Sequence, residues 1–311
     1  MKRKMLNVPK GGYDGMKGFT IVEFLVAGLL SIIVLIAVVS SYFTSRKLND
    51  AANGRLAIQQ DLRNAATLIV RDARMAGSFG CFNMSEHTEK DVVFDVAQKN
   101  RPFSLKGSSA NKLIPIAESL NIGYQGFAQV RPALIFQYGI DDVNASAETT
   151  VVSSCGVISK PGKQIPTLED AKKELKIQNS GKEQNGNIAR QRHVVNAYAV
   201  GRIAGEEGLF RFQLDDKGKW GNPQLLVKKV KRMDVRYIYV SGCPEDAGKE
   251  EQFKYTDKFD KSRDAVTPAG VEVLLDSGLD AKIAASSDNS IYAYRINATI
   301  RGGNVCANRT L

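Results

Sequence analysis

The chain has 311 residues, of which 43% are hydrophobic and 24% charged, and its 43 lysines and arginines outnumber its 33 aspartates and glutamates. This composition excludes a wholly disordered chain, a collagen and a low-complexity protein. The length allows one large domain or two ordinary ones. Because His87 and His193 are the only histidines, the sequence offers little material for a histidine-rich metal site or a histidine-activated nucleophile.

Residues 1–18 contain five basic side chains and one acidic one, and an apolar stretch follows them directly. The 22 residues between Glu23 and Arg46 carry no charge. As a helix they span about 33 Å, enough to cross a hydrocarbon core of about 30 Å. Basic residues before such a span favour a cytoplasmic N-terminus, so the chain after it is predicted to be exported. A cleavable signal peptide is the alternative, but the apolar run exceeds the usual ~7–15 residues and lacks a clear A-x-A cleavage site.

Glu23 is the one carboxylate within the apolar stretch. A charged side chain in the middle of a membrane helix costs about 2.5–3.5 kcal/mol on insertion scales, so it is expected to have a partner or a function. The alternative is an interfacial glutamate near the helix end that reaches water among the lipid headgroups.

Residues 17–23, KGFTIVE, resemble the prepilin processing motif of type IV pilins. The resemblance implies that residues 1–18 are a leader, which a prepilin peptidase removes between Gly18 and Phe19. It also implies that the new N-terminal Phe19 is N-methylated and that Glu23 is kept. In a filament core, Glu23 and the Phe19 ammonium of a neighbouring subunit are expected to neutralise each other, which makes Glu23 an assembly residue and not a catalyst.

Met1 and Met16 are both candidate translation starts, and both give the same mature chain. Removal of residues 1–18 takes away four of the ten excess positive charges. The basic balance of the whole chain is therefore weak support for nucleic-acid binding.

The apolar pattern continues past the predicted membrane span at spacings of three and four residues, which indicates an amphipathic helix. This stripe consists of Leu48, Ala52, Leu56, Leu62, Ala65, Ala66, Ile69, Ala73 and Ala76. The charged residues that flank it are Arg55, Asp61, Arg63, Arg71, Asp72 and Arg74.

One helix is predicted over residues 19–76, about 87 Å long, with Gly77 as its stop signal. Residues 19–45 are expected in the membrane or filament core, and residues 46–80 are expected to form the amphipathic half of the same helix. Because Gly54 and Gln59 interrupt the pattern, a kink or frayed turn is an option over residues 53–60.

From Cys81 onward the pattern changes to strands and turns, which predicts a β-rich head over 81–311. The fold class is therefore predicted to be α+β, a long N-terminal helix packed on an antiparallel β-rich head. The predicted strands are 112–117, 127–138 with an interruption at Pro132, 193–203, 209–214, 224–240, 271–275 and 291–301. Polar residues 160–192 and 243–265 are expected at the surface, with a short helix over Thr167–Ile177 that Thr167 and Asp170 cap.

Residues 61–81, DLRNAATLIVRDARMAGSFGC, resemble the helix end of the PilW family of minor pilins, called PilJ in some systems. This family is related to the J-type minor pseudopilins of type II secretion. The resemblance implies a pilin-like fold and a low-copy subunit that primes pilus assembly with other minor pilins and the major pilin. It also implies an inner-membrane protein with a periplasmic head, assembled by an inner-membrane platform and later present in the filament at the cell surface. Because Glu23 is present, the chain does not fit the topmost, K-type role.

If the chain after the apolar stretch is exported, its four cysteines are expected to form disulfides, because disulfides form in an oxidising periplasm. Cys81, Cys155, Cys243 and Cys306 are expected to form two disulfides, and three connectivities are open. The pairs Cys81–Cys155 and Cys243–Cys306 are favoured, since the second would tie the polar 243–265 segment to the C-terminal strand. Each is expected to contribute about 2–4 kcal/mol. A metal site is not expected, because no C-x-x-C pair and no nearby histidine is present.

Other patterns give weaker indications. Basic residues 228–232 lie close to Tyr237 and Tyr239, which would suit DNA capture, but a solvated strand edge is the favoured explanation and nucleic acid is not an expected partner. Residues 215–218, DDKG, are typical of a hairpin turn. No nucleophile-elbow, HExxH, P-loop or dinucleotide motif occurs, so no enzymatic activity and no cofactor is predicted. The alternatives to a minor pilin are a type II secretion pseudopilin and a membrane-anchored enzyme, adhesin or DNA-uptake subunit.

Overall fold

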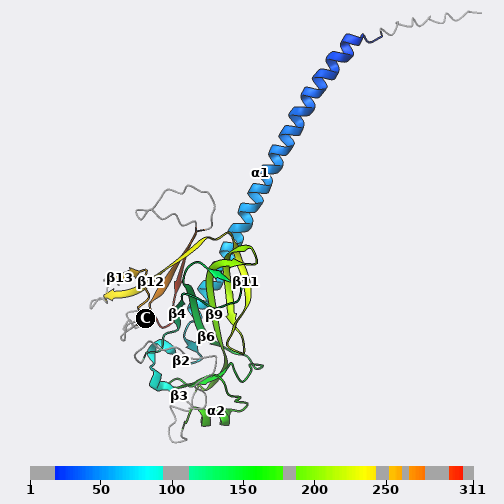
Figure 1. Cartoon of the computed structure of the whole chain (residues 1–311). Coiled ribbons are helices and arrows are strands. Elements are labelled where there is room, and N and C mark those ends of the chain that lie inside the picture. The colour runs from blue at the N-terminus through cyan, green and yellow to red at the C-terminus, as the bar shows by residue number, and fades with distance from the viewer. Residues whose placement is uncertain are drawn as a thin grey trace, which may run out of the picture. The chain divides into compact units, whose positions relative to one another are not determined.

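The structure is a computed structural model, and it describes residues 18–93, 112–177, 187–242, 252–260, 266–276 and 294–303. One long apolar N-terminal helix, α1 (Ile21–Met75), is followed by a β-rich globular head (Figure 1). This architecture agrees with the predicted α+β class. The chain divides into two compact units, the first ending at Ala57 and the second beginning at Ile58.

The head contains mainly short strands. In chain order its elements are β1 (Ser78–Phe79), β2 (Phe82–Asn83), 3-10 turns at Met84–Glu86 and Glu89–Asp91, β3 (Val92–Val93), β4 (Ile116–Ser119), β5 (Ala128–Gln129), β6 (Ala133–Ile140), β7 (Thr150–Ser153), β8 (Ile158–Ser159), α2 (Leu168–Glu174), β9 (Ala189–Ile203), β10 (Glu206–Leu214), β11 (Trp220–Lys228), β12 (Arg232–Gly242), β13 (Gln252–Thr256), β14 (Gly270–Asp276) and β15 (Tyr294–Thr299).

In the first unit α1 has no buried residue among those described. Leu48, Ala52 and Leu56, the first members of the predicted amphipathic stripe, are exposed in this unit. The helix is continuous through residues 53–60, and no break occurs at Gly54.

In the second unit the apolar stripe of α1 is buried as predicted from Leu62 onward. Leu62, Ala65, Ile69 and Ala73 lie in the main core, together with Ala76 just beyond the helix end. The alanines allow the backbone of the helix to come close to its neighbours, because only a methyl group separates them.

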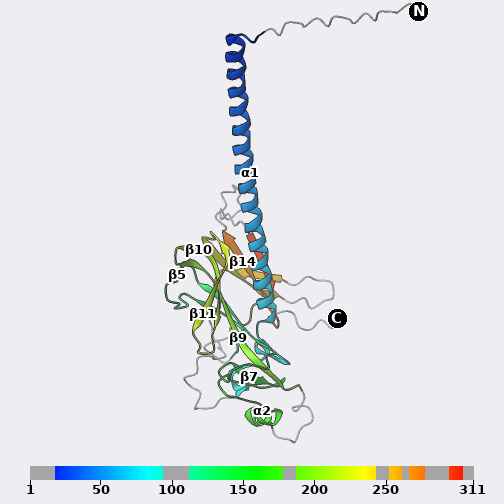
Figure 2. The same ribbon diagram turned by 90° about the vertical axis from the view of Figure 1, so that its right-hand side faces the viewer.

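β9 is the central strand of the larger, nine-stranded sheet (Figure 2). One edge of β9 pairs with β10 and β7, and its other edge pairs with β6 and β5, all antiparallel. Because side chains alternate along a strand, Tyr198 and Val200 point to the same face as Leu134 and Phe136 of β6. These four side chains share the main core with α1.

The other face of this sheet carries a second apolar cluster that includes Phe127, Phe210 and Phe212. The ring centroids of Phe127 and Phe212 are 4.9 Å apart. Gly201 lies under Phe127, and a Cβ there would come within 2.4 Å of the ring. The aromatic ring therefore packs directly on the backbone of β9, which requires glycine at this position.

The smaller sheet has the order β13-β12-β14-β15, and all its pairings are antiparallel. Its inner face, including Tyr237, Val271 and Ile296, joins the same main core as α1. The predicted single strand over 224–240 is wrong, because β11 ends at Lys228 and β12 begins at Arg232 in the other sheet. Lys229 has a positive φ of 62°, and the chain turns here from one sheet to the other.

The polar segment 160–192 was expected entirely at the surface, and this is wrong in part. Ile165, Ala171 and Leu175 are buried with Val152 of β7, so α2 packs beside that strand (Figure 2). The predicted cap of α2 is confirmed, because Thr167 Oγ1 accepts a hydrogen bond from the Asp170 backbone N–H at 3.1 Å. Residues 189–192 belong to β9 and not to a surface excursion.

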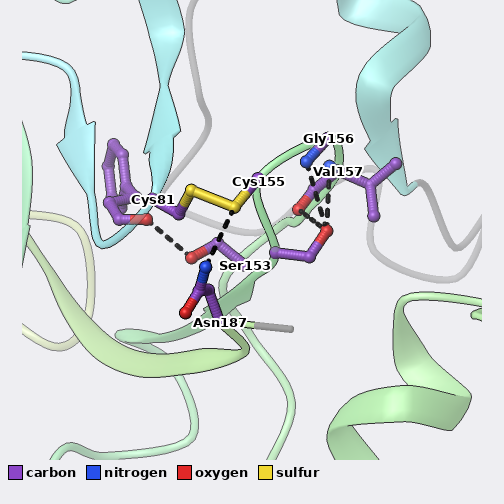
Figure 3. Close-up of a disulfide and its surroundings, with 8 residues drawn as sticks. Cys81, Ser153, Cys155, Gly156, Val157 and Asn187 are labelled. Carbon is purple, nitrogen blue, oxygen red and sulfur yellow. Dashed lines mark hydrogen bonds between the residues drawn. A yellow bond between two sulfur atoms is a disulfide. The ribbon is translucent and has the colours of Figure 1, made fainter. Parts of the chain in front are cut away.

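Cys81 and Cys155 are joined by a disulfide that links the turn after β1 to the segment after β7 (Figure 3). This is one of the two favoured pairs, and Cys243 and Cys306 lie outside the described residues. Beside the bridge, Ser153 donates its hydroxyl to the Phe79 carbonyl at 2.7 Å. The disulfide therefore ties the chain just after α1 to the larger sheet.

His193 is fully buried in β9, where its Nε2 lies 3.2 Å from Gln137 Oε1. Its ring also packs against Phe79, with centroids 5.7 Å apart. Burial lowers the pKa of His193 to about 4, because the charged form would lose its hydration. The histidine is thus neutral in the folded protein throughout the neutral range.

Because the pKa of His193 is lowered by burial, we expect the free energy of unfolding to depend on pH. The unfolded chain binds a proton on His193 near pH 6.5 and the folded chain does so only near pH 4, so stability is lost as the pH falls between these values. The loss should amount to about 3 kcal/mol, since one pKa unit corresponds to about 1.4 kcal/mol. Urea unfolding of the wild type and His193→Gln between pH 8 and 4 measures it. The difference between the two proteins should be constant above pH 7 and change below it; a constant difference throughout would contradict the prediction.

Candidate functional site

The predicted processing site lies at the start of α1. Gly18 and Phe19 precede the helix, which begins at Ile21. Phe19 is 87% exposed, and apart from its chain neighbours no described residue has an atom within 4 Å of the position that a Cβ on Gly18 would occupy. The Gly18–Phe19 peptide bond is therefore accessible and lies outside the helical hydrogen-bonding pattern.

Thr20 and Glu23 form a reciprocal cap at this helix start. Glu23 Oε2 accepts hydrogen bonds from the Thr20 backbone N–H at 3.0 Å and from its hydroxyl at 3.1 Å. Thr20 Oγ1 in turn accepts from the Glu23 N–H at 3.3 Å. This is the geometry of a capping box, and the T-x-x-E spacing at residues 20–23 was the sequence signal for it. Glu23 was predicted to act in assembly or to lie at the membrane interface, and this local role in the helix cap was not predicted.

The first half of α1 presents apolar side chains on all sides. Exposed large hydrophobic residues extend from Phe19 to Phe43. Within the described residues, α1 is the helix that is long and apolar enough to cross a membrane, and no part of its most apolar stretch is buried. Glu23 is the one charged side chain between Gly18 and Ser45.

A second polar site, not predicted, lies near the other end of the helix. Asp72, predicted to be one of the charged residues that flank the stripe, is fully buried on the packed face of α1. That assignment was wrong, and the spacing gave the signal, because Asp72 lies three residues after Ile69 and four before Ala76 in the buried stripe.

The Asp72 carboxylate is held by side chains from three adjacent strands. Tyr138 of β6 donates to Oδ1 at 2.9 Å, and Tyr198 and Asn196 of β9 donate to Oδ2 at 2.7 and 2.8 Å. Arg211 of β10 lies 3.7 Å from Oδ2. We call these residues, with Arg71, the Asp72 cluster.

Two arginines lie close to the Asp72 carboxylate. Arg71, the preceding residue of α1, bonds to Oδ1 from Nη2 at 3.0 Å. Burial, with the nearby charge of Asp72, raises the pKa of Tyr138 to about 12 and also raises the pKa of Tyr198. Both hydroxyls therefore stay protonated at neutral pH and act as donors to the carboxylate.

The basic residues at 228–232 do not form a strand face. They surround the turn between β11 and β12, and two of them are matched by acids: Lys228 Nζ lies 3.6 Å from Glu206 Oε2, and Arg232 pairs with Asp234. Residues 215–218 form the expected turn, with Asp215 Oδ1 accepting from the Lys217 N–H at 2.9 Å. Among the described residues, no group of three or more His, Cys, Asp and Glu could hold a metal ion.

Comparisons with protein-family models, with curated proteins and with solved structures returned no match.

Proposed function

We propose that this chain is a minor pilin of the PilW type that helps to prime assembly of a type IV pilus. The observation that carries the proposal is the helix start: an accessible Gly18–Phe19 bond, then a capped helix with Glu23 as the one carboxylate of an apolar half whose large side chains are exposed. A membrane-anchored enzyme or adhesin needs the apolar helix, but neither needs a carboxylate within it.

The exposed apolar half of α1 supports a place in lipid or among other helices. Large side chains such as Leu29, Ile33 and Ile36 are more than half exposed, and water is an unfavourable solvent for them. In this proposal the helix resides in the inner membrane with the head in the periplasm, and it later packs with other pilin helices in the filament core. Its partners are the prepilin peptidase, the inner-membrane assembly platform, other minor pilins and the major pilin.

The mature N-terminus tests the proposal. We expect mass spectrometry of the protein from its own membranes to find a chain that begins at methylated Phe19. Gly18→Val is the matched variant, because the surroundings of Gly18 are open and the added side chain cannot disturb the fold. It should leave the head folded and block cleavage, since the backbone could no longer approach a peptidase closely. An intact leader in the wild type, or cleavage near residue 40, would overturn the proposal.

A further inference from the structure

The Asp72 cluster connects α1 to the middle of the larger sheet. Its strand residues come from β6, β9 and β10, and β9 pairs with β6 on one side and β10 on the other. Three uncharged donors and the Arg211 guanidinium all meet on the same carboxylate. Asp72 cannot leave its site without breaking contacts to three strands at once.

The apolar contacts of the helix do not fix its position along its own axis as strictly. Ala73 and Ala76 are small and lie three residues apart, so a shift of the helix by three residues puts one alanine in the place of the other with little change in packing. A shift by one turn, about 5.4 Å, would bring Ile69 or Ala76 to the place of Asp72. Tyr138, Tyr198 and Asn196 would then lose their acceptor, and the carboxylate would be buried among apolar side chains. Asp72 therefore selects one axial position of the helix on the sheet.

After the helix, a disulfide attaches the chain covalently to the head. Gly77 begins the connection, where its N–H donates to the Gln137 carbonyl at 2.8 Å, and the Cys81–Cys155 disulfide lies four residues further on. Between the start of the second unit at Ile58 and this disulfide, Asp72 is the one fully buried charged residue of α1. A force applied along α1 from its N-terminal end therefore acts on the contacts of the Asp72 cluster before it acts on the disulfide.

We propose that the Asp72 cluster is the point at which axial force on α1 is transferred to the head, and that it holds the helix in register under load. Asp72 acts here as a positioning residue, and Tyr138, Asn196, Tyr198 and Arg211 form its receptor on the sheet. The source of the load, a filament that pulls on the helix, rests on the proposed function. The resistance of α1 to detachment under load is a property of the folded chain and does not require a filament.

The test is single-molecule pulling of the full chain in detergent micelles, with handles at exposed Ser45 on α1 and Lys217 in the β10–β11 turn. In the wild type we expect the helix segment up to Cys81 to detach in one step. In Asp72→Asn the rate of detachment at a fixed load should rise about tenfold or more, because one charged partner of a buried network is lost.

Glu272→Gln is the matched control. Glu272 is also a buried carboxylate, it contacts Arg236 and Arg295, and none of its described contacts is with α1. It should lower equilibrium stability while leaving the detachment rate close to that of the wild type. Equal acceleration in both variants, or none in Asp72→Asn, would overturn the proposal.

If Asp72→Asn does not fold, Tyr198→Phe serves instead, since it removes one hydroxyl from the receptor and keeps the ring in the core. It should accelerate detachment severalfold, whereas an unchanged rate would count against the proposal. Because the pulling experiment needs no pilus, its failure is separate from a failure of the pilin proposal, which the mature N-terminus decides.

Discussion

Asp72→Ala should lower the free energy of unfolding by about 3–5 kcal/mol, the effect expected when one partner of a buried charge network is removed. The substitution leaves the hydroxyls of Tyr138 and Tyr198 and the Asn196 amide without their shared acceptor in a site closed to water. Arg211, whose side chain is only 14% exposed, would keep its charge and lose its carboxylate. Urea unfolding of the full chain in detergent measures the loss.

Asp61→Ala is the control for this measurement. Asp61 lies on the same helix, three turns before Asp72, and is partly exposed. Removal of such a surface carboxylate is expected to change stability by no more than about 0.5 kcal/mol. A loss below about 1 kcal/mol in Asp72→Ala would show that the network is not what holds α1 against the sheet.

The sequence allowed the main division of the molecule to be predicted, because it depends on patterns that are local. An uncharged run from Phe24 to Ser45 and a stripe at spacings of three and four residues are sufficient to indicate a long helix with two different halves. The turn at residues 215–218 and the cap of α2 were likewise predicted from neighbouring residues.

Features that depend on distant residues were not predicted. Asp72 has the charge of a surface residue, and its burial follows from donors that lie 66, 124 and 126 residues away in the chain. Similarly, residues 224–240 all suit a strand, and nothing local shows that Lys229 takes a left-handed conformation and sends β12 into the other sheet.

Glu23→Ala is expected to remove this protein from filaments while its head stays folded and its leader is still cleaved. In the proposed filament core, Glu23 neutralises the Phe19 ammonium of a neighbour in surroundings of low dielectric, and stranding that ammonium costs several kcal/mol. Since each 1.4 kcal/mol is a factor of ten, incorporation should fall by about a hundredfold or more. The measurement is the ratio of the protein in sheared filaments to the protein left in the membrane.

The capping box offers a competing explanation for Glu23, and Glu23→Gln separates the two. Glutamine at this position can still accept from the Thr20 N–H and so keeps the cap, but it carries no charge. If the charge matters, Glu23→Gln should fail to assemble as Glu23→Ala does. Thr20→Ala, which weakens the cap by about 1 kcal/mol and keeps the carboxylate, should then assemble nearly normally. Normal assembly of Glu23→Gln together with failure of Thr20→Ala would instead make Glu23 a structural cap, because only the charge distinguishes a counter-ion from a hydrogen-bond acceptor.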